Sequence, residues 1–274
     1  MSNHSAYRTF VDRLSKTKDS AREKSTKKRK DLGLRTAREN LDDLVDPGSF
    51  LEFGAFAVAA QRNRRDYEEL QLETSADGIL TGFCNINEDE VGEDNSHAAA
   101  IIYDYSVLAG SQGFFHHQKL DRICEKAEEF SLPVVIFTEG GGGRPGDTDV
   151  ATQVAGLHIP SFSTWARLTG KCLKIAVNNG YCFAGNAVLF GCSDFMIATK
   201  KSWIGMAGPA MIEGGGLGIY DPKEIGPAEE QYKNGVLDYL AEDEKEATFV
   251  AKKLLSYFQG NLSDWSIDDQ TKLR

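Results

Sequence analysis

The 274-residue chain lacks the features of several large protein classes. No apolar run approaches the ~20 residues of a membrane-spanning helix, and the first five residues contain no apolar signal segment. We therefore expect a cytoplasmic protein without membrane contact. The five cysteines are odd in number and include no C-x-x-C pair, which disfavours a disulfide framework and a zinc ribbon.

The histidines and charges exclude two further classes. The five histidines form no H-x-x-x-H or H-E-x-x-H pattern, so we expect no metal in this chain. The net charge of −10 argues against a nucleic-acid partner. With 41% hydrophobic and 26% charged residues, the composition is typical of a globular protein.

The charge is unevenly distributed along the chain. Residues 1–30 carry ten Lys and Arg against three acids, a balance of +7, whereas the rest carries 21 against 38, a balance of −17. Two interpretations of the basic head stay open. It is a solvated helix or arm, or it contacts a phosphorylated ligand or an acidic partner.

The pattern of apolar residues predicts an α/β fold. Residues 6–45 are expected to be helical, with a capping box at Thr36 and Glu39. Beyond them, nearly continuous apolar strands separated by amphipathic helices indicate a mostly parallel sheet covered on both faces. Strands are predicted at 79–86, 98–103, 133–138, 173–177 and 195–198, and helices at 111–130, 150–170, 185–190 and 242–258.

Two glycine-rich turns interrupt this pattern. The first contains Gly140 to Gly143, and the second runs from Asn178 to Asn186 and opens a helix. Small residues let backbone N–H groups approach a ligand oxygen, and two such groups aimed at one point form an oxyanion hole. Tight packing alone is the alternative explanation. Cys182, between apolar neighbours, is interpreted as a buried thiol rather than a nucleophile.

Further motifs occur in a fixed order around these turns. They are Leu34-Arg-Thr-Ala-Arg-Glu39, Leu44-Val-Asp-Pro-Gly-Ser-Phe-Leu-Glu52, Ala76-Asp-Gly-Ile-Leu-Thr-Gly82, Tyr105-Ser-Val-Leu-Ala-Gly-Ser111 and Asn234-Gly-Val-Leu-Asp238. Together they resemble the crotonase superfamily, and within it the carboxyltransferase component of biotin-dependent acyl-CoA carboxylases. The resemblance covers nearly all of residues 34–260. It implies a crotonase-like ββα spiral fold with an N-terminal helical extension.

The chain departs from the family pattern in two turns and in length. The family's acidic-Ser-Gly-Gly-Ala-Arg turn stands here as Glu139-Gly-Gly-Gly-Gly-Arg144, and Cys-Ala-Gly-Gly stands as Cys182-Phe-Ala-Gly185. Family members resemble two crotonase-like halves of about 500 residues in total, and this chain matches the N-terminal half. We expect an extension at 1–45, the domain at 46–262, and a linker toward a second domain at 263–274.

The resemblance implies transfer of a carboxyl group from carboxybiotin to the α-carbon of an acyl-CoA. An oxyanion hole then stabilises the enolate. Ala184 and Gly185 are expected to donate the N–H groups, and Gly142 and Gly143 to form the facing wall. Coenzyme A is expected at the basic head, Lys119, Arg144, Gly110 and Ser111. Lys119 is alternatively a solvated residue on an exposed helix face, and Arg144 alternatively pairs with Asp147 or Asp149.

The same resemblance implies partners and leaves two other functions open. The partners are the carboxyltransferase C-terminal half, biotin carboxylase and a biotin carrier that delivers the cofactor, in a homo- or hetero-oligomer. Hydratase chemistry is disfavoured, because no carboxylate stands among residues 186–189, where such enzymes carry a glutamate. An acyl-CoA decarboxylase subunit and a non-catalytic half that binds coenzyme A or a partner remain alternatives.

Overall fold

The computed structural model describes residues 3–150, 159–260 and 271. Its main sheet has seven strands in the order β1-β2-β3-β4-β5-β7-β9. The pairs β1–β2 and β2–β3 are antiparallel, and every later pair is parallel, so the predicted mostly parallel sheet is confirmed. The strands are β1 Leu51–Phe53, β2 Ile79–Asn85, β3 His97–Tyr103, β4 Val134–Phe137, β5 Lys174–Asn178, β7 Phe195–Thr199 and β9 Tyr239–Ala241.

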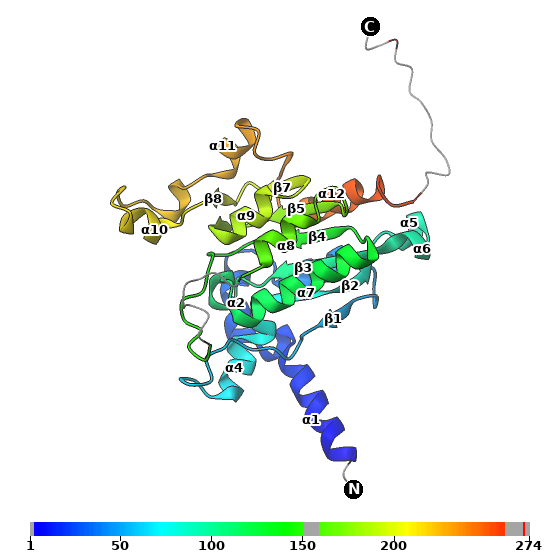
Figure 1. The fold of residues 1–274 in the computed structure, drawn as a ribbon, viewed down its shortest axis with the longest axis vertical. Coiled ribbons are helices and arrows are strands. Elements are labelled where there is room, and N and C mark those ends of the chain that lie inside the picture. The colour runs from blue at the N-terminus through cyan, green and yellow to red at the C-terminus, as the bar shows by residue number, and fades with distance from the viewer. Residues whose placement is uncertain (1–2, 151–158, 261–270, 272–274) are drawn as a thin grey trace.

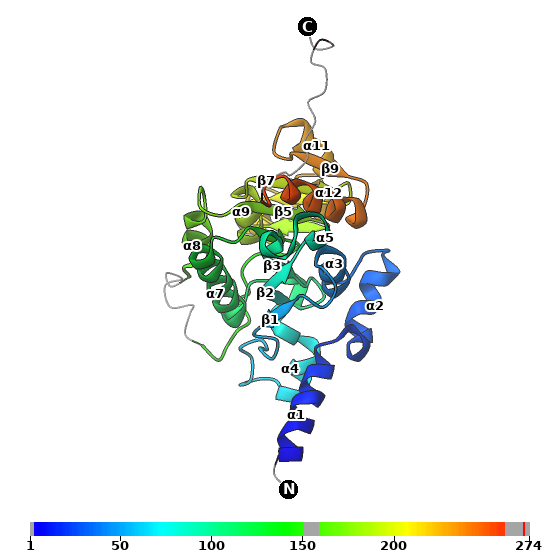
Figure 2. The ribbon, with the colours of Figure 1, turned by 90° about the vertical axis from the view of Figure 1, so that its right-hand side faces the viewer.

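Helices cover both faces of this sheet (Figures 1 and 2). One face packs against α7 (Phe114–Phe130), α8 (Ser161–Arg167) and α9 (Gly185–Gly191), and the other against α3 (Ala37–Leu44) and α12 (Glu244–Ser256). Alternation along β3 explains the two layers, because successive side chains of a strand point to opposite faces. Ile101 joins the core under α7, and Ala100 and Ile102 join the core under α3 and α12.

The N-terminal region forms separate helices rather than a single long one. These are α1 (Asn3–Lys16), α2 (Glu23–Asp31) and α3, with a short 3-10 turn η1 (Asp19–Ala21) between the first two. Gly33 separates α2 from α3 with a φ of +66°, a conformation that favours glycine. The capping box at Thr36 and Glu39 is confirmed. Helix α1 projects from the body (Figure 1).

Several short elements are not predicted by the sequence pattern. Strands β1 and β9, together with the separate parallel pair β6 (Tyr181–Phe183) and β8 (Trp203–Gly205), have only three residues each, too few to show a period. The other short elements are helices α4 Tyr67–Glu73, α5 Glu88–Val91, α6 Glu93–Ser96, α10 Pro209–Gly214 and α11 Ala228–Lys233, and 3-10 turns η2 Ser75–Gly78, η3 Leu108–Gly110 and η4 Pro222–Glu224.

Two predicted segments lie partly outside the described residues, and one predicted burial is wrong. Of the helix expected at 150–170, residues 151–158 lie outside the described residues, and α8 begins at Ser161. Apart from residue 271, the expected linker at 263–274 also lies outside them. Phe130 is predicted on the buried face of its helix, but it lies at the helix end with 55% of its surface exposed.

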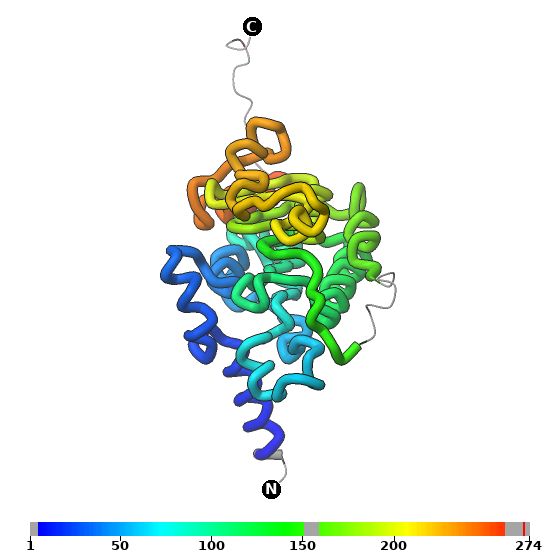
Figure 3. Tube along the Cα trace, turned by 90° about the vertical axis from the view of Figure 1, so that its left-hand side faces the viewer, coloured from blue at the N-terminus to red at the C-terminus, as the bar shows by residue number. Residues whose placement is uncertain are grey.

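Figure 3 shows the yellow and orange chain around α10 and α11 apart from the blue N-terminal helices.

Candidate active site

The two glycine-rich turns lie against each other. The first follows β4, and the second joins β5 to β6 and then to α9. Backbone hydrogen bonds connect them, because Gly140 N donates to Tyr181 O at 2.7 Å and Phe183 N donates to Gly140 O at 2.9 Å. A Cβ added to Gly142 would stand 2.8 Å from the Cβ of Ala184, so only glycine allows this approach.

Asn186 holds the two turns together. Its amide Nδ2 donates to Thr138 O at 3.0 Å, and its Oδ1 accepts the N–H of Gly142 at 3.0 Å. The side chain is fully buried, so both bonds are shielded from water. In the sequence, Asn186 stands out only as a position without a carboxylate. An asparagine in the first turn of a helix that follows a glycine turn is the signal that indicates this role.

Of the four residues expected to form the oxyanion hole and its facing wall, two have backbone N–H groups that are already engaged. The N–H of Ala184 donates to Gly205 O at 3.1 Å, and the N–H of Gly142 donates to Asn186. The expectation that Ala184 offers a free donor is therefore wrong for this conformation. Among the described residues, the N–H groups of Gly185 and Gly143 have no hydrogen-bond partner, and both glycines reach the surface.

Ala184 has an unusual backbone conformation. Its φ of +52° and ψ of −120° belong to a region that glycine occupies and that alanine adopts only with strain. The family pattern has glycine here, and the sequence alone does not indicate which backbone region the alanine adopts. The strained residue directly precedes Gly185 and so sets the direction in which the Gly185 N–H points.

Arg144 ends the first glycine turn and fixes it through contacts with Asp77, Asp147 and Ser111. Its guanidinium forms an ion pair with Asp77 and lies 3.6 Å from Asp147, and its Nη2 donates to Ser111 O at 2.7 Å. With 3% of its side chain exposed, it is enclosed by these partners. Of the two interpretations, the structure favours the loop-shaping one. Asp147 is an expected partner, whereas Asp77 is not, and Asp149 instead accepts backbone N–H groups of residues 62 and 63.

The other residues expected to bind coenzyme A also have structural partners. The prediction of Lys119 on an exposed helix face is wrong, because it is 8% exposed and its Nζ donates to Ala76 O at 2.8 Å and to Ile79 O. Burial lowers the pKa of Lys119 to about 8. A Cβ on Gly110 would stand 2.4 Å from Glu139 O, and Ser111 Oγ donates to Leu108 O at 2.6 Å.

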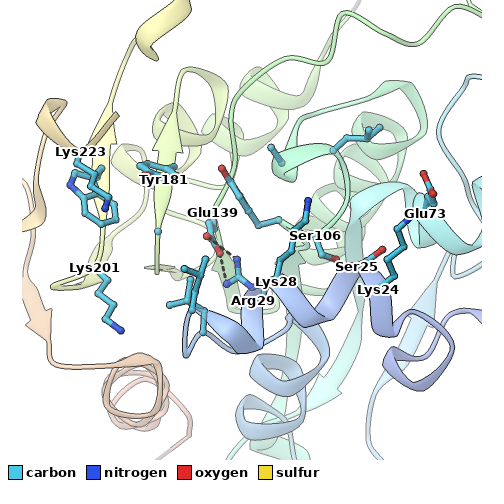
Figure 4. Close-up of a pocket in the computed structure, with 17 residues that line it drawn as sticks. Lys24, Ser25, Lys28, Arg29, Glu73, Ser106, Glu139, Tyr181, Lys201 and Lys223 are labelled. Carbon is cyan, nitrogen blue, oxygen red and sulfur yellow. Dashed lines mark hydrogen bonds and ion pairs between the residues drawn. The ribbon is translucent and has the colours of Figure 1, made fainter. Parts of the chain in front are cut away.

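A cavity of about 900 Å³ lies beside the turns, between α2 and the segment that carries β8 (Figure 4). Lys24 and Lys28 enter it from α2, and Lys201 and Lys223 from the opposite side. These four ammonium groups form no ion pair among the described residues, so the cavity has a strong positive charge. Its aromatic wall comprises Tyr105, Tyr181 and Trp203, with Tyr181 and Trp203 in contact at 5.1 Å between ring centroids.

Glu139 forms the floor of this basic cavity. Its carboxylate makes two contacts with Arg29 of α2, at 3.0 and 2.7 Å, and burial raises the pKa of Glu139 to about 7 against the opposing effect of Arg29. A second cavity of about 690 Å³ opens on the other side of the first turn, where Gly143, Gln112 and His117 line it. The two cavities therefore flank the glycine turns.

Three further observations concern the part of the chain that the structure describes. No group of three or more His, Cys, Asp and Glu residues there is arranged to hold a metal ion. Within the same residues, no helix has the length and apolar character to cross a bilayer. Cys182 is fully buried, and burial raises its pKa to about 12, which confirms a packed thiol rather than a nucleophile.

Comparison with known proteins decides the family. The family model described as "Carboxyl transferase domain" matches residues 28–269. This chain belongs to the carboxyl transferase domain family. The methylmalonyl-CoA carboxyltransferase 12S subunit of Propionibacterium freudenreichii is 31% identical to it over 87% of this chain and 43% of that protein. The chain thus spans a little under half the length of such curated relatives.

Solved structures support the same assignment. A single-chain, multi-domain long-chain acyl-CoA carboxylase matches 98% of this chain and 27% of its own, with 48% sequence identity and a TM-score of 0.90. The transcarboxylase 12S structure, described with hexamer assembly and hydrolysed methylmalonyl-CoA, matches 94% of this carboxyl transferase domain and 49% of its own chain, with a TM-score of 0.77 and 27% identity. The predicted crotonase-like α/β fold is therefore confirmed.

Proposed function

We propose that this chain is the acyl-CoA-binding half of a biotin-dependent carboxyltransferase, which moves a carboxyl group between carboxybiotin and the α-carbon of an acyl-CoA. The observation that carries the proposal is the contact between two glycine turns that lie between the two cavities. Among the described residues, the N–H groups of Gly143 and Gly185 in these turns have no hydrogen-bond partner. Gly143 lines the second cavity, and Gly180 and Tyr181 of the second turn line the cavity that carries the four lysines. Carboxyl transfer needs an enolate, and these N–H groups are suited to stabilise its oxygen.

The N–H of Gly185 is the principal donor to the enolate oxygen in this proposal, and Gly143 supplies the second. By analogy with measured oxyanion holes, each donor lowers the barrier by about 3–4 kcal/mol. Ala184 then positions Gly185 rather than donating itself, since its N–H is held by Gly205. Gly142 keeps the two turns in contact. Carboxybiotin, as the second substrate, reaches the turn through the cavity lined by Gly143.

The basic cavity binds coenzyme A in this proposal. Lys24 and Lys28 belong to the basic head and meet the phosphates, together with Lys201 and Lys223. The adenine ring packs on the aromatic wall at Trp203. Gly110 and Ser111 support the turn that closes this cavity, while Lys119 and Arg144 hold the backbone beneath it instead of reaching the phosphates.

The site is completed by other polypeptides. A cluster of large apolar side chains at positions 206–220 is exposed, as is unusual for a monomer. It comprises Met206, Met211, Leu217, Ile219 and Tyr220. We assign this surface to the carboxyltransferase C-terminal half, reached through the linker at 263–274 or as a separate chain. A biotin carrier and biotin carboxylase complete the system, and the similarity to a long-chain acyl-CoA carboxylase points to a long acyl chain.

Calorimetric titration with acetyl-, propionyl- and palmitoyl-CoA tests the binding step. We expect binding of all three through the nucleotide, with palmitoyl-CoA tightest. Lys28→Ala should raise Kd at least about tenfold, because a charge-assisted hydrogen bond to phosphate contributes about 1.5–3 kcal/mol. Lys27→Ala, on the same helix but outside the cavity, is the matched control and should leave Kd unchanged. If none of the three acyl-CoA compounds bound the chain, the proposal would be overturned.

An activity assay tests the division into halves. The isolated chain should transfer little or no carboxyl group, and addition of the second half should restore transfer. Robust carboxylated product from this chain alone would refute the missing-half interpretation. Detection of CO2 release from a carboxylated acyl-CoA, without the reverse reaction, would favour the decarboxylase alternative, to which the similarity with the Veillonella parvula methylmalonyl-CoA decarboxylase subunit alpha also points.

A further inference from the structure

Helix α2 is basic on two sides that have different partners. Lys24 and Lys28 face the basic cavity, whereas Arg22, at the N-terminal end of the helix, and Arg29 turn inward and are 5% and 6% exposed. Each arginine forms a buried ion pair with a carboxylate that follows a sheet strand. Arg22 pairs with Asp104 at 2.8 Å, after β3, and Arg29 pairs with Glu139, after β4. The helix that carries the lysines is thus attached to the sheet at two points.

The attachment at Glu139 leads directly to the glycine turns. Glu139 precedes Gly140, and its side chain lies against the second turn, where a Cβ on Gly180 would stand 2.1 Å from Glu139 Oε1. Its carbonyl oxygen packs on Gly110, at 2.4 Å from an added Cβ. Glu139 therefore contacts α2 through its carboxylate, which meets Arg29 in Figure 4. It contacts the second turn through its side chain at Gly180 and joins the first turn through its peptide bond to Gly140.

In the part of the chain that the structure describes, the attachment at Asp104 involves Arg22 and Ser106 and no residue of the glycine turns. Its carboxylate accepts hydrogen bonds from Arg22 and from the backbone and hydroxyl of Ser106, and within the described residues none of these bonds reaches a glycine turn. Arg22 and Arg29 therefore form a natural pair for comparison. Both hold α2 and both are buried, and the carboxylate partner of Arg29 alone continues into a glycine turn. Arg29 also donates to Arg35 O at 2.7 Å and lies 3.8 Å from Glu244.

We propose that Glu139 is a positioning residue that couples ligand binding at the α2 lysines to the geometry of the glycine turns. The proposal rests on the function proposed above, because coenzyme A is the ligand. When phosphates bind Lys24 and Lys28, α2 is held in place, and the two-point contact of Arg29 with Glu139 passes this restraint to Gly140 and Gly180. Binding of the remote nucleotide thereby orders the groups that meet the thioester oxygen.

Hydrogen–deuterium exchange of the full chain, with and without saturating coenzyme A, tests the coupling. In the unmodified protein we expect coenzyme A to slow exchange in peptides from α2, and also about tenfold in peptides covering 140–144 and 180–187, within the range of known couplings. In Glu139→Gln, which keeps the shape and removes the charge, Kd should rise less than threefold. Protection should then persist in α2 and fall below twofold in the glycine turns.

The matched control is Arg22→Lys, which disturbs the other attachment of α2. At saturating coenzyme A it should retain the protection of both glycine turns. If Glu139→Gln does not fold, as judged by circular dichroism and its melting temperature, Arg29→Lys provides the same test, because lysine keeps the positive charge but cannot bind both carboxylate oxygens as arginine does. A merely structural role of Glu139 would lower stability without separating protection in α2 from protection in the turns.

The outcomes separate this inference from the proposed function. If coenzyme A binds and protects the glycine turns equally in Glu139→Gln and the unmodified protein, the inference is overturned and the function stands. If coenzyme A slows exchange only in peptides from α2 of the unmodified protein, the inference is likewise overturned and the proposed function stands. If coenzyme A does not bind the unmodified chain at all, the proposed function fails, and the coupling fails with it.

Discussion

Replacing Ala184 by glycine should stabilise the protein. The strained backbone at this position, with φ +52° and ψ −120°, costs alanine about 1–3 kcal/mol, and glycine adopts it freely. Against this gain stands the larger conformational entropy of glycine in the unfolded chain, about 0.4–1 kcal/mol. The group that is removed is a single methyl group on a half-buried residue, so little favourable packing disappears. The net expectation is a rise of about 0.5–2 kcal/mol in the free energy of unfolding.

Urea denaturation followed by circular dichroism measures this change. A higher midpoint with an unchanged slope indicates a change of stability rather than of the unfolded state. Ala187→Gly is the control, because Ala187 lies in the same short helix with ordinary helical geometry, and it should lose about 1 kcal/mol. Equal destabilisation by both substitutions would show that Ala184 is not strained, and the account of this turn would have to be abandoned.

Three further predictions concern the surroundings of the turns. Asp77→Asn removes one partner of a fully buried ion pair and should cost about 3–5 kcal/mol in urea denaturation, whereas Glu230→Gln at an exposed pair should change stability by no more than about 1 kcal/mol. Gly142→Ala, with φ +89° and a Cβ 2.8 Å from that of Ala184, should lose at least about 1 kcal/mol in thermal melts, while Gly143→Ala meets no neighbour within 4 Å and should melt normally. Burial lowers the pKa of His117 to about 4 from the ordinary 6.5, so on acidification this histidine takes up a proton in the unfolded chain before it does so in the folded protein. The free energy of unfolding should therefore fall as the pH is lowered from 6.5 to 4. If the urea midpoint of His117→Gln fell with pH as steeply as that of the unmodified protein, this prediction would be contradicted.

The sheet was predictable because its main strands are long and apolar. The runs at 79–86 and 98–103 correspond to β2 and β3 within a residue at each end, and the glycine turns are visible from composition alone. The contact of Gly142 with the second turn involves two segments that follow β4 and β5, and the parallel pairing of these strands in the structure brings the segments together.

The polar contacts were not predictable in the same way. Arg144 pairs with Asp77, 67 positions earlier, and Lys119 donates to carbonyls about 40 positions away. Periodicity describes a single element, whereas these partners depend on how distant elements pack. The N–H of Ala184 is predicted to meet a ligand, yet β8, which is only three residues long, brings Gly205 to it. Short strands carry too little pattern to reveal such a partner.

Arg29 of α2 and Arg22, which directly precedes the helix, also constrain the order in which the molecule is assembled. Arg22 and Arg29 find their partners 82 and 110 positions further along the chain. Closing loops of this length is entropically costly until the sheet has brought the far ends together. The basic wall of the cavity therefore forms late, after β3 and β4 are in place. A ribosome-bound chain that ends before residue 139 should carry α2 as a loosely attached helix and should have no affinity for coenzyme A.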